Sequence, residues 1–116
     1  MPVSTAYNSK LNPLQIRQEL NLSRERLSRL LHVSAKTLER WEKRNEILDP
    51  EANRIFAKIR EISELVHALY VPEGVEAFLM TPQAVFGGRT ALDLMSLGEF
   101  DKVIAALAAD YEGLGQ

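Results

Sequence analysis

The sequence predicts an all-α protein. Apolar side chains recur at helical spacing, as in the row Ile55, Ile59, Ile62 and Val66, and this period is the primary signal of an amphipathic helix. A side chain that can cap a helix stands ahead of most of the apolar stretches. No alternating strand pattern is stronger than this helical period, and the sequence shows no internal repeat.

The first 70 residues are expected to form four helices. Each is preceded by a side chain that can accept a backbone N–H at the helix start, namely Asn12, Ser23, Ser34 and Asp49. Proline takes the first helical position after the first and the last of these caps. The first helix is expected to end at Leu20 and the fourth at about Tyr70. In the second and third helices, apolar side chains within 27–31 and 38–41 are expected to face inward.

The remaining residues predict shorter elements. Helical segments are expected at about 72–80, 81–88 (a single turn), 90–97 and 99–111. Thr90 and Asp93 have the spacing of a capping box at the start of the third segment. Gly98 separates the last two segments, and Gly113 and Gly115 are expected to end the ordered chain.

Charge is divided unevenly along the chain. Residues 1–60 carry 12 Lys or Arg against 7 Asp or Glu, whereas residues 61–116 carry 2 against 9, so halves of +5 and −7 make up the net charge of −2. A basic half suits phosphate and an acidic half is repelled by it, which indicates two different partners. The sequence has no cysteine, so neither disulfides nor thiolate metal sites are expected and a reducing cytoplasm fits. Neither a signal peptide nor a membrane span is expected.

The stretch LSRERLSRLLHVSAKTLERWEKR, residues 22–44, predicts a helix-turn-helix. Two short helices are joined by a tight turn, and the second helix presents side chains that hydrogen-bond base edges in a major groove. Its start can face a phosphate, with further cations beside the DNA backbone. The predicted DNA-contacting residues are Arg24, Ser34, Ala35, Lys36, Thr37, Arg40, Lys43 and Arg44. The alternative is a plain two-helix corner whose Lys and Arg are solvated.

The same stretch resembles the Xre-type (lambda-repressor-like) helix-turn-helix family. The residues that carry the resemblance are Leu27-Ser28, Val33-Ser34 and Trp41-Glu42. The resemblance implies a DNA-binding bundle at residues 1–48 that reads paired half-sites as a homodimer. One departure is His32, where the family commonly has a glycine in the left-handed conformation, because a histidine is strained there.

Residues 86–94, FGGRTALDL, raise the question of a phosphate-binding loop. A P-loop needs Gly-x-x-x-x-Gly-Lys-Ser/Thr after a strand, whereas here Gly87 and Gly88 are adjacent, Arg89 follows them and a helix precedes them. The competing interpretation is that the two glycines end one helix and permit a sharp turn, after which Thr90 and Asp93 cap the next helix. That interpretation accounts for every residue of the stretch except Arg89.

No catalytic or metal-binding cluster stands out in the sequence. His32 and His67 lie on separate elements, with no carboxylate at metal-ligand spacing. Glu61 and Glu64 lie on a helix face where solvated carboxylates are routine. The chain is therefore expected not to be an enzyme and to use neither a metal nor a cofactor.

Residues 72–113 resemble the Xre/MbcA/ParS toxin-binding domain. The matching features, in chain order, are Phe78-Leu79, Thr81-Pro82, Gly87-Gly88-Arg89-Thr90, Leu92 to Met95, Gly98, and Val103 to Leu107. Ala91 stands where the family usually has proline. The expected organisation is a DNA-binding domain at 1–48, a long connecting helix at 49–71, and a small helical toxin-binding domain with a C-terminal tail at 72–116.

The two resemblances together imply an antitoxin of a bacterial type II toxin–antitoxin pair that also binds its own promoter DNA for autoregulation. The implied partner is a RES-domain toxin that consumes NAD or transfers ADP-ribose, and the antitoxin covers its active site. The predicted toxin-binding residues are Gly87, Gly88, Arg89, Thr90, Tyr111, Leu114 and Gln116. The tail 110–116 either plugs the toxin's diphosphate site with its terminal carboxylate or is an ordinary frayed end.

Two other functions compete with this one. A stand-alone Xre-family transcription regulator would use the C-terminal helices only to dimerise, and an enzyme would need a polar cluster that the sequence lacks. The apolar rows within 50–70 and 99–111 serve either packing within the chain or a dimer contact, and the spacing does not distinguish these uses.

Overall fold

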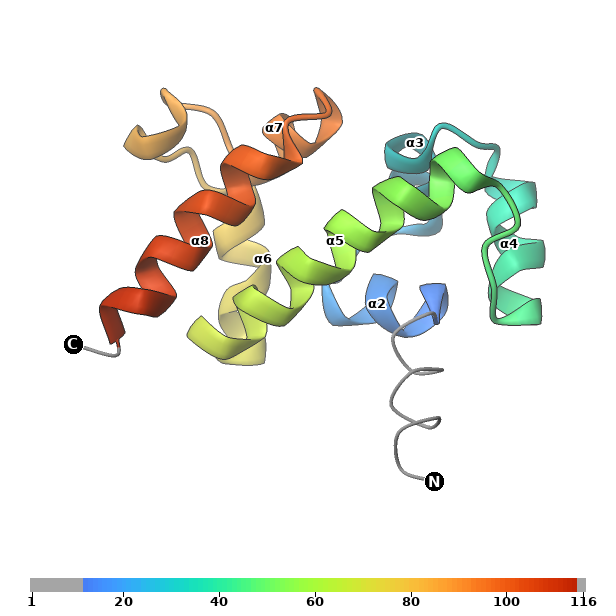
Figure 1. The fold of residues 1–116 in the computed structure, drawn as a ribbon, viewed down its shortest axis with the longest axis horizontal. Helices are drawn as coiled ribbons and strands as arrows, with labels where there is room; N and C mark the ends of the chain where they lie inside the picture. The colour runs from blue at the N-terminus through green and yellow to red at the C-terminus, as the bar shows by residue number, and fades with distance from the viewer. Residues whose placement is uncertain (1–11, 115–116) are drawn as a thin grey trace. The chain divides into compact units, whose positions relative to one another are not determined.

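The structure is a computed structural model that describes residues 12–114. Its elements are α2 (Pro13–Glu19), α3 (Arg24–Leu31), α4 (Ala35–Arg44), α5 (Pro50–Leu69), α6 (Pro72–Met80), the 3₁₀ turn η1 (Ala84–Phe86), α7 (Ala91–Ser96) and α8 (Phe100–Leu114) (Figure 1). The predicted all-α class is confirmed, because the described residues form helices and loops without a strand. None of the helices within this range has the length and apolar character that a bilayer crossing requires.

The chain forms two compact units whose boundary lies inside α5, between Arg60 and Glu61. The sequence set residues 49–71 apart as a connecting helix. In the structure, the first half of α5 belongs with the N-terminal unit and the second half with the C-terminal unit.

Local caps start the helices of the N-terminal unit. Asn12, Ser23, Ser34 and Asp49 each accept the backbone N–H of the residue three positions later, at 3.1, 3.1, 3.0 and 2.8 Å. The four predicted helix starts are thereby confirmed. α3 packs against α4, and α2 also packs against α4. The buried apolar side chains of this unit are Ile16, Leu20, Leu22, Leu27, Leu30, Leu31, Leu38, Trp41, Ala52, Ile55, Phe56 and Ile59.

The C-terminal unit packs α6 against α7 and α7 against α8. Tyr70, just after α5, lies over α6 with its ring centroid 5.3 Å from that of Phe78. The predicted capping box at the start of α7 is present: the Thr90 hydroxyl oxygen accepts from the Asp93 N–H at 2.9 Å, and the Asp93 carboxylate accepts from the Thr90 N–H at 3.1 Å. The buried apolar side chains here are Ile62, Val66, Val75, Phe78, Leu79, Phe86, Ala91, Leu92, Leu94, Met95, Phe100, Val103 and Leu107.

The predicted end of the last helix is wrong. The sequence placed it at about Tyr111 with a loose tail beyond, whereas α8 continues through Gly113 to Leu114. A glycine ends a helix by turning left-handed, and Gly113 is not among the glycines with positive φ. The alanine-rich stretch 105–109 before it favours helix strongly. Gly115 lies outside the described residues.

Candidate functional site

The corner between α3 and α4 is set by backbone geometry. His32 is left-handed, with φ 61° and ψ 39°, and the N–H of Val33 donates to the Ser28 carbonyl at 3.0 Å. Ser34 then starts α4, with its hydroxyl oxygen accepting the Thr37 N–H at 3.0 Å. A helix end of this type needs a left-handed residue, which glycine provides freely and histidine only with strain. The structure therefore has His32 in a strained left-handed conformation at the turn between the two short helices, at the position where the family commonly has glycine.

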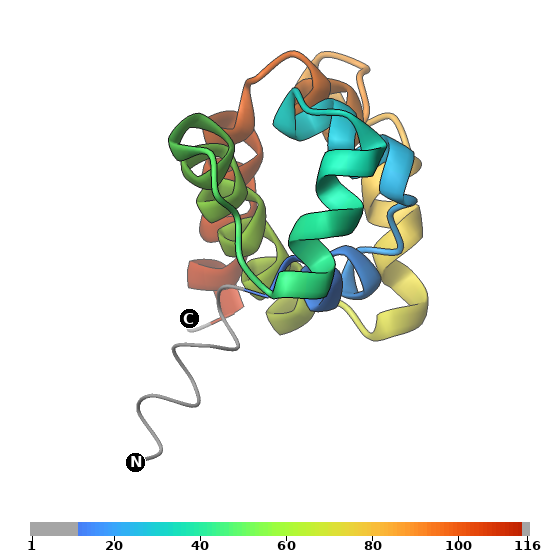
Figure 2. The same cartoon turned by 90° about the vertical axis from the view of Figure 1, so that its right-hand side faces the viewer.

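The predicted DNA-contacting residues line the outer face of α4 and the ends of the corner. Figure 2 looks onto this helix, drawn in blue-green. Ser34, Lys36, Arg40, Lys43 and Arg44 are exposed, while Arg24, Ala35 and Thr37 are half-buried. Hydrogen bonds run along this face: the Ser34 hydroxyl donates to the Thr37 hydroxyl at 3.0 Å, and Arg40 Nη2 donates to the same oxygen at 3.3 Å. The structure therefore brings one hydroxyl pair and a row of cations to a single helix face.

Arg24 has a structural role that the sequence interpretation missed. Glu42, on the inner side of α4, is buried and receives two arginines: Arg17 from α2, with Nε 2.6 Å from Oε2, and Arg24 from α3, with Nε 3.0 Å from Oε1. Arg17 Nη2 also donates to Glu42 Oε1 at 3.3 Å, and its Nη1 donates to the Leu22 carbonyl at 3.2 Å. One carboxylate thereby ties three helices together, and Arg24 is held at the start of α3 beside the predicted DNA face.

One feature of the sequence points to this ion cluster. Glu42 stands four positions after Leu38 and next to Trp41, so it falls on the inward face of α4. A carboxylate on a core-facing row needs a cationic partner, because burial of an unpaired charge is costly. The partner, Arg17, is 25 residues away, and only the tertiary fold identifies it.

The glycine loop before α7 is closed by its own backbone. The N–H groups of Gly87, Gly88 and Arg89 donate to carbonyls of residues 83–86 at 2.9 to 3.2 Å, and the Thr90 N–H donates to the Asp93 carboxylate at 3.1 Å. Both glycines are left-handed, with φ 66° and 86°. A phosphate-binding loop presents unused N–H groups to the anion, and these four already donate within the chain. This stretch is therefore a helix end and a glycine turn followed by a capped helix start, and its geometry does not match that of a phosphate-binding loop.

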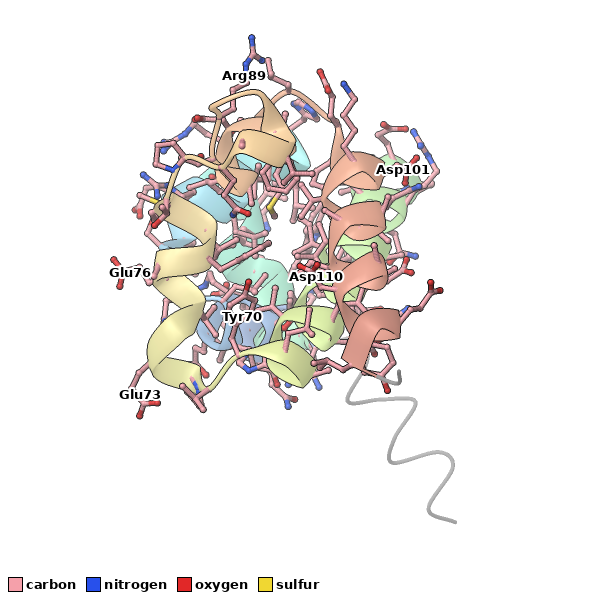
Figure 3. All side chains as sticks on the ribbon, turned by 90° about the vertical axis from the view of Figure 1, so that its left-hand side faces the viewer. Tyr70, Glu73, Glu76, Arg89, Asp101 and Asp110 are labelled. Atoms are coloured by element: carbon pink, nitrogen blue, oxygen red, sulfur yellow. The ribbon has the colours of Figure 1, made fainter. Side chains whose placement is uncertain are left out.

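Arg89 extends from this loop into solvent at one end of the unit (Figure 3). With Asp93, Ser96 and Leu97 it lines a shallow hollow of about 300 Å³. Nearby, the pKa of Glu99 lies below its ordinary value, chiefly because Lys102 donates a hydrogen bond to it and adds positive charge, with a smaller contribution from the charge of Arg89. The Lys102 Nζ to Glu99 Oε1 distance is 2.7 Å. Arg89 thus lies close enough to the Lys102–Glu99 pair for its charge to act on Glu99.

The predicted toxin-binding residues separate into two groups. The loop at 87–90 lies at one end of the C-terminal unit, whereas α8 ends, with Tyr111 and Leu114, at the other (Figures 1 and 3). The 15 residues of α8 correspond to a length of about 21 Å at 1.5 Å per step. Tyr111 and Leu114 are exposed on the last turn of α8, and Gln116 lies outside the described residues. A partner that contacts both groups must therefore extend along the whole of α8.

The described residues contain no group of three or more His, Asp or Glu side chains able to hold a metal ion. His32 lies at the corner after α3, in the N-terminal unit, and His67 lies in the last turn of α5, in the C-terminal unit. Within residues 12–114, the candidate surfaces are therefore the cationic face of α4 and the exposed ends of the C-terminal unit.

Comparison of the sequence with protein-family models and with curated proteins gives no match. Among solved structures, the fold is similar to a chain in the crystal structure of the M. tuberculosis MbcT-MbcA toxin-antitoxin complex. The likeness has a TM-score of 0.71 at 17% sequence identity and covers 85% of this chain and 89% of the other chain. The two chains therefore share a fold along nearly their whole lengths.

Proposed function

We propose that this chain is the antitoxin of a bacterial type II toxin–antitoxin pair. The observation that carries the proposal is the fold likeness, which extends over 85% of the chain to a chain of a toxin-antitoxin complex. The order of the motifs supports it, because a helix-turn-helix stretch at 22–44 precedes a segment at 72–113 that resembles a toxin-binding domain. The chain itself carries no catalytic activity and no cofactor in this proposal.

The proposed partner is a RES-domain toxin that consumes NAD or transfers ADP-ribose. The resemblance of residues 72–113 to the toxin-binding family supports this choice. The charge of the C-terminal half also supports it, since 9 acidic against 2 basic side chains in residues 61–116 complement a cleft built for an anionic dinucleotide. Covering that cleft would inhibit the toxin without any chemistry in this chain.

The N-terminal unit is proposed to bind promoter DNA ahead of its own gene as a homodimer, which gives autoregulation. Lys36, Arg40, Lys43 and Arg44 are exposed on α4, and side chains of this kind contact bases and phosphates from a helix in the major groove. The Ser34–Thr37–Arg40 hydrogen bonds hold part of this face in order before DNA arrives. Ordered side chains lose less conformational entropy on binding.

The toxin assignment is tested by expressing the protein encoded in the neighbouring reading frame with and without this chain. We expect growth arrest from the neighbour alone, rescue by this chain, a purified complex of the two proteins, and NAD consumption by the neighbour that stops in the complex. A harmless neighbour, or one whose activity and toxicity are unchanged by this chain, would reject the antitoxin and favour a stand-alone transcription regulator.

The DNA assignment is tested by a gel shift with the promoter fragment and the double variant Lys36→Glu/Arg40→Glu. Its matched control is Arg89→Glu/Lys102→Glu, which changes the net charge equally but lies in the C-terminal unit. We expect the first variant to lose promoter binding and the control to retain it. Equal affinities of the α4 variant and the unmodified chain would refute DNA contact by this helix.

A further inference from the structure

Four exposed apolar side chains lie at one end of the C-terminal unit. Tyr70 and Val71 form the corner between α5 and α6, and Tyr111 and Leu114 lie on the last turn of α8. The end of α5, the start of α6 and the end of α8 lie at the same end of this unit in both views (Figures 1 and 3). We call these four residues the apolar end.

Val71 is poorly suited to the folding of α6. It occupies the N-cap position, with φ −68° and ψ 158°, and it makes no side-chain cap bond. Valine is among the least favourable N-cap residues, whereas Ser or Asp would satisfy an N–H at the start of the helix. Its side chain is also 66% exposed, so it contributes little to the core. A residue that breaks a local folding rule without a gain in packing is expected where a binding surface requires it.

The charged residues around the apolar end are acidic. Glu73 lies in the first turn of α6 and points away from the unit (Figure 3), and Asp110 and Glu112 lie in the last turns of α8. The sequence of residues 61–116 contains two Lys or Arg, which are Arg89 at the opposite end and Lys102 near the start of α8.

This charge distribution favours one kind of occupant. A second copy of the chain docking through the same surface would bring like charges together, which is unfavourable. A partner with Lys or Arg around an apolar hollow is complementary both to the four apolar side chains and to their acidic rim.

We propose that the apolar end is the main contact surface for the toxin partner, and that the toxin receives it in an apolar hollow rimmed by Lys and Arg. This inference rests on the proposed function and adds the α5–α6 corner, which the sequence interpretation did not include. Large apolar side chains at the centre of a contact, surrounded by polar groups that exclude water, commonly carry most of the binding energy. Arg89 and the glycine loop then lie outside this central contact.

The test uses Val71 and a matched valine at the other end of the same unit. Val85, in η1, is 68% exposed, and η1 lies at the end opposite the apolar end (Figure 3). Val71→Ser, Val71→Lys, Val85→Ser and Val85→Lys are made in the full chain. Binding to the purified protein from the neighbouring reading frame is measured by titration calorimetry, and the thermal midpoint of each variant by circular dichroism.

We expect Val71→Ser to weaken binding at least about tenfold, which corresponds to roughly 1.4 kcal/mol, while its thermal midpoint rises because the serine can cap α6. Loss of binding together with a gain in stability cannot be ascribed to unfolding. Val71→Lys should weaken binding further, because the lysine faces a basic rim. Both Val85 variants should bind within about twofold of the unmodified chain, as changes outside a binding centre commonly do.

Three outcomes would overturn the inference while leaving the antitoxin in place. These are Val71 variants that bind as tightly as the unmodified chain, Val85 variants that weaken binding as much as Val71 variants, and Val71→Lys binding more tightly than Val71→Ser. An unmodified chain that forms no complex with the neighbouring protein would reject the proposed function itself. The two failures are therefore distinguishable in one set of titrations.

Discussion

Replacing Glu42 with glutamine removes the charge that holds α2, α3 and α4 together. The carboxylate has a side-chain exposure of 3% and accepts three hydrogen bonds, two from Arg17 at 2.6 and 3.3 Å and one from Arg24 at 3.0 Å. A glutamine keeps one acceptor oxygen, but its NH₂ group then faces an arginine N–H, so at least one donor is left unpaired. Breaking a buried pair from one side costs about 3–5 kcal/mol. Since Arg24 is 38% exposed and can turn to water, we expect about 3 kcal/mol.

The assay is urea and thermal unfolding followed by the fluorescence of Trp41. Trp41 is the single tryptophan of the sequence and is buried in the N-terminal unit, so its emission reports on the packing of that unit. A loss of about 3 kcal/mol corresponds to a fall in Tm of roughly 12–24 °C for a unit of this size.

The control for this prediction is Glu39→Gln, the same substitution on the same helix. Glu39 pairs with Lys43 at 3.7 Å in an exposed position, and such pairs contribute about 0–1 kcal/mol. If Glu42→Gln destabilised the unit by less than about 1 kcal/mol, or by no more than the control does, the cluster would not hold the three helices.

Three smaller effects follow from the same geometry. His32→Gly should stabilise the N-terminal unit by about 1 kcal/mol in the Trp41 assay, since glycine relieves the left-handed strain at φ 61°; a loss of stability would contradict this. Gly113→Ala, where an added Cβ meets nothing within 4 Å, should increase helix formation in the last turn of α8 by up to about 1 kcal/mol, seen as slower amide exchange, and unchanged exchange would argue against a helical end. Lys102→Met should raise the pKa of Glu99, followed by NMR. In the unmodified chain that pKa is lowered, so the stability it contributes is present at neutral pH and is lost as the pH falls through the lowered value; an identical titration in both proteins would count against the pair.

The helix starts could be predicted because capping is a local interaction. Asn12, Ser23, Ser34 and Thr90 each accept an N–H three residues later, so the residue type and spacing suffice to identify them. The glycine turn at 87–88 was predictable for a similar reason, because a left-handed backbone costs glycine no strain, and both residues have positive φ. These features determine the bounds of the elements, and through them which face of α4 is exposed.

The ion cluster and the apolar end depend on distant residues, so spacing could not reveal them. Arg17 and Glu42 are 25 residues apart, and the α5–α6 corner lies at the same end of the C-terminal unit as the end of α8 only because of the way α6, α7 and α8 fold (Figure 3). The end of α8 was mispredicted for a different reason. Gly113 is compatible with either a helix or a left-handed stop, and the helix-forming alanines before it decide the outcome.

The two candidate surfaces have different physical chemistry, and salt acts on them differently. The proposed DNA face presents four exposed cations on α4, and each phosphate they neutralise would lower the logarithm of the binding constant by about 0.9 per decade of salt. At the apolar end, acidic residues surround four exposed apolar side chains, which the proposed contact would bury. Screening of such a rim slows association but leaves the hydrophobic contribution intact. Under the proposed function, a rise in ionic strength should therefore release promoter DNA well before it releases the toxin.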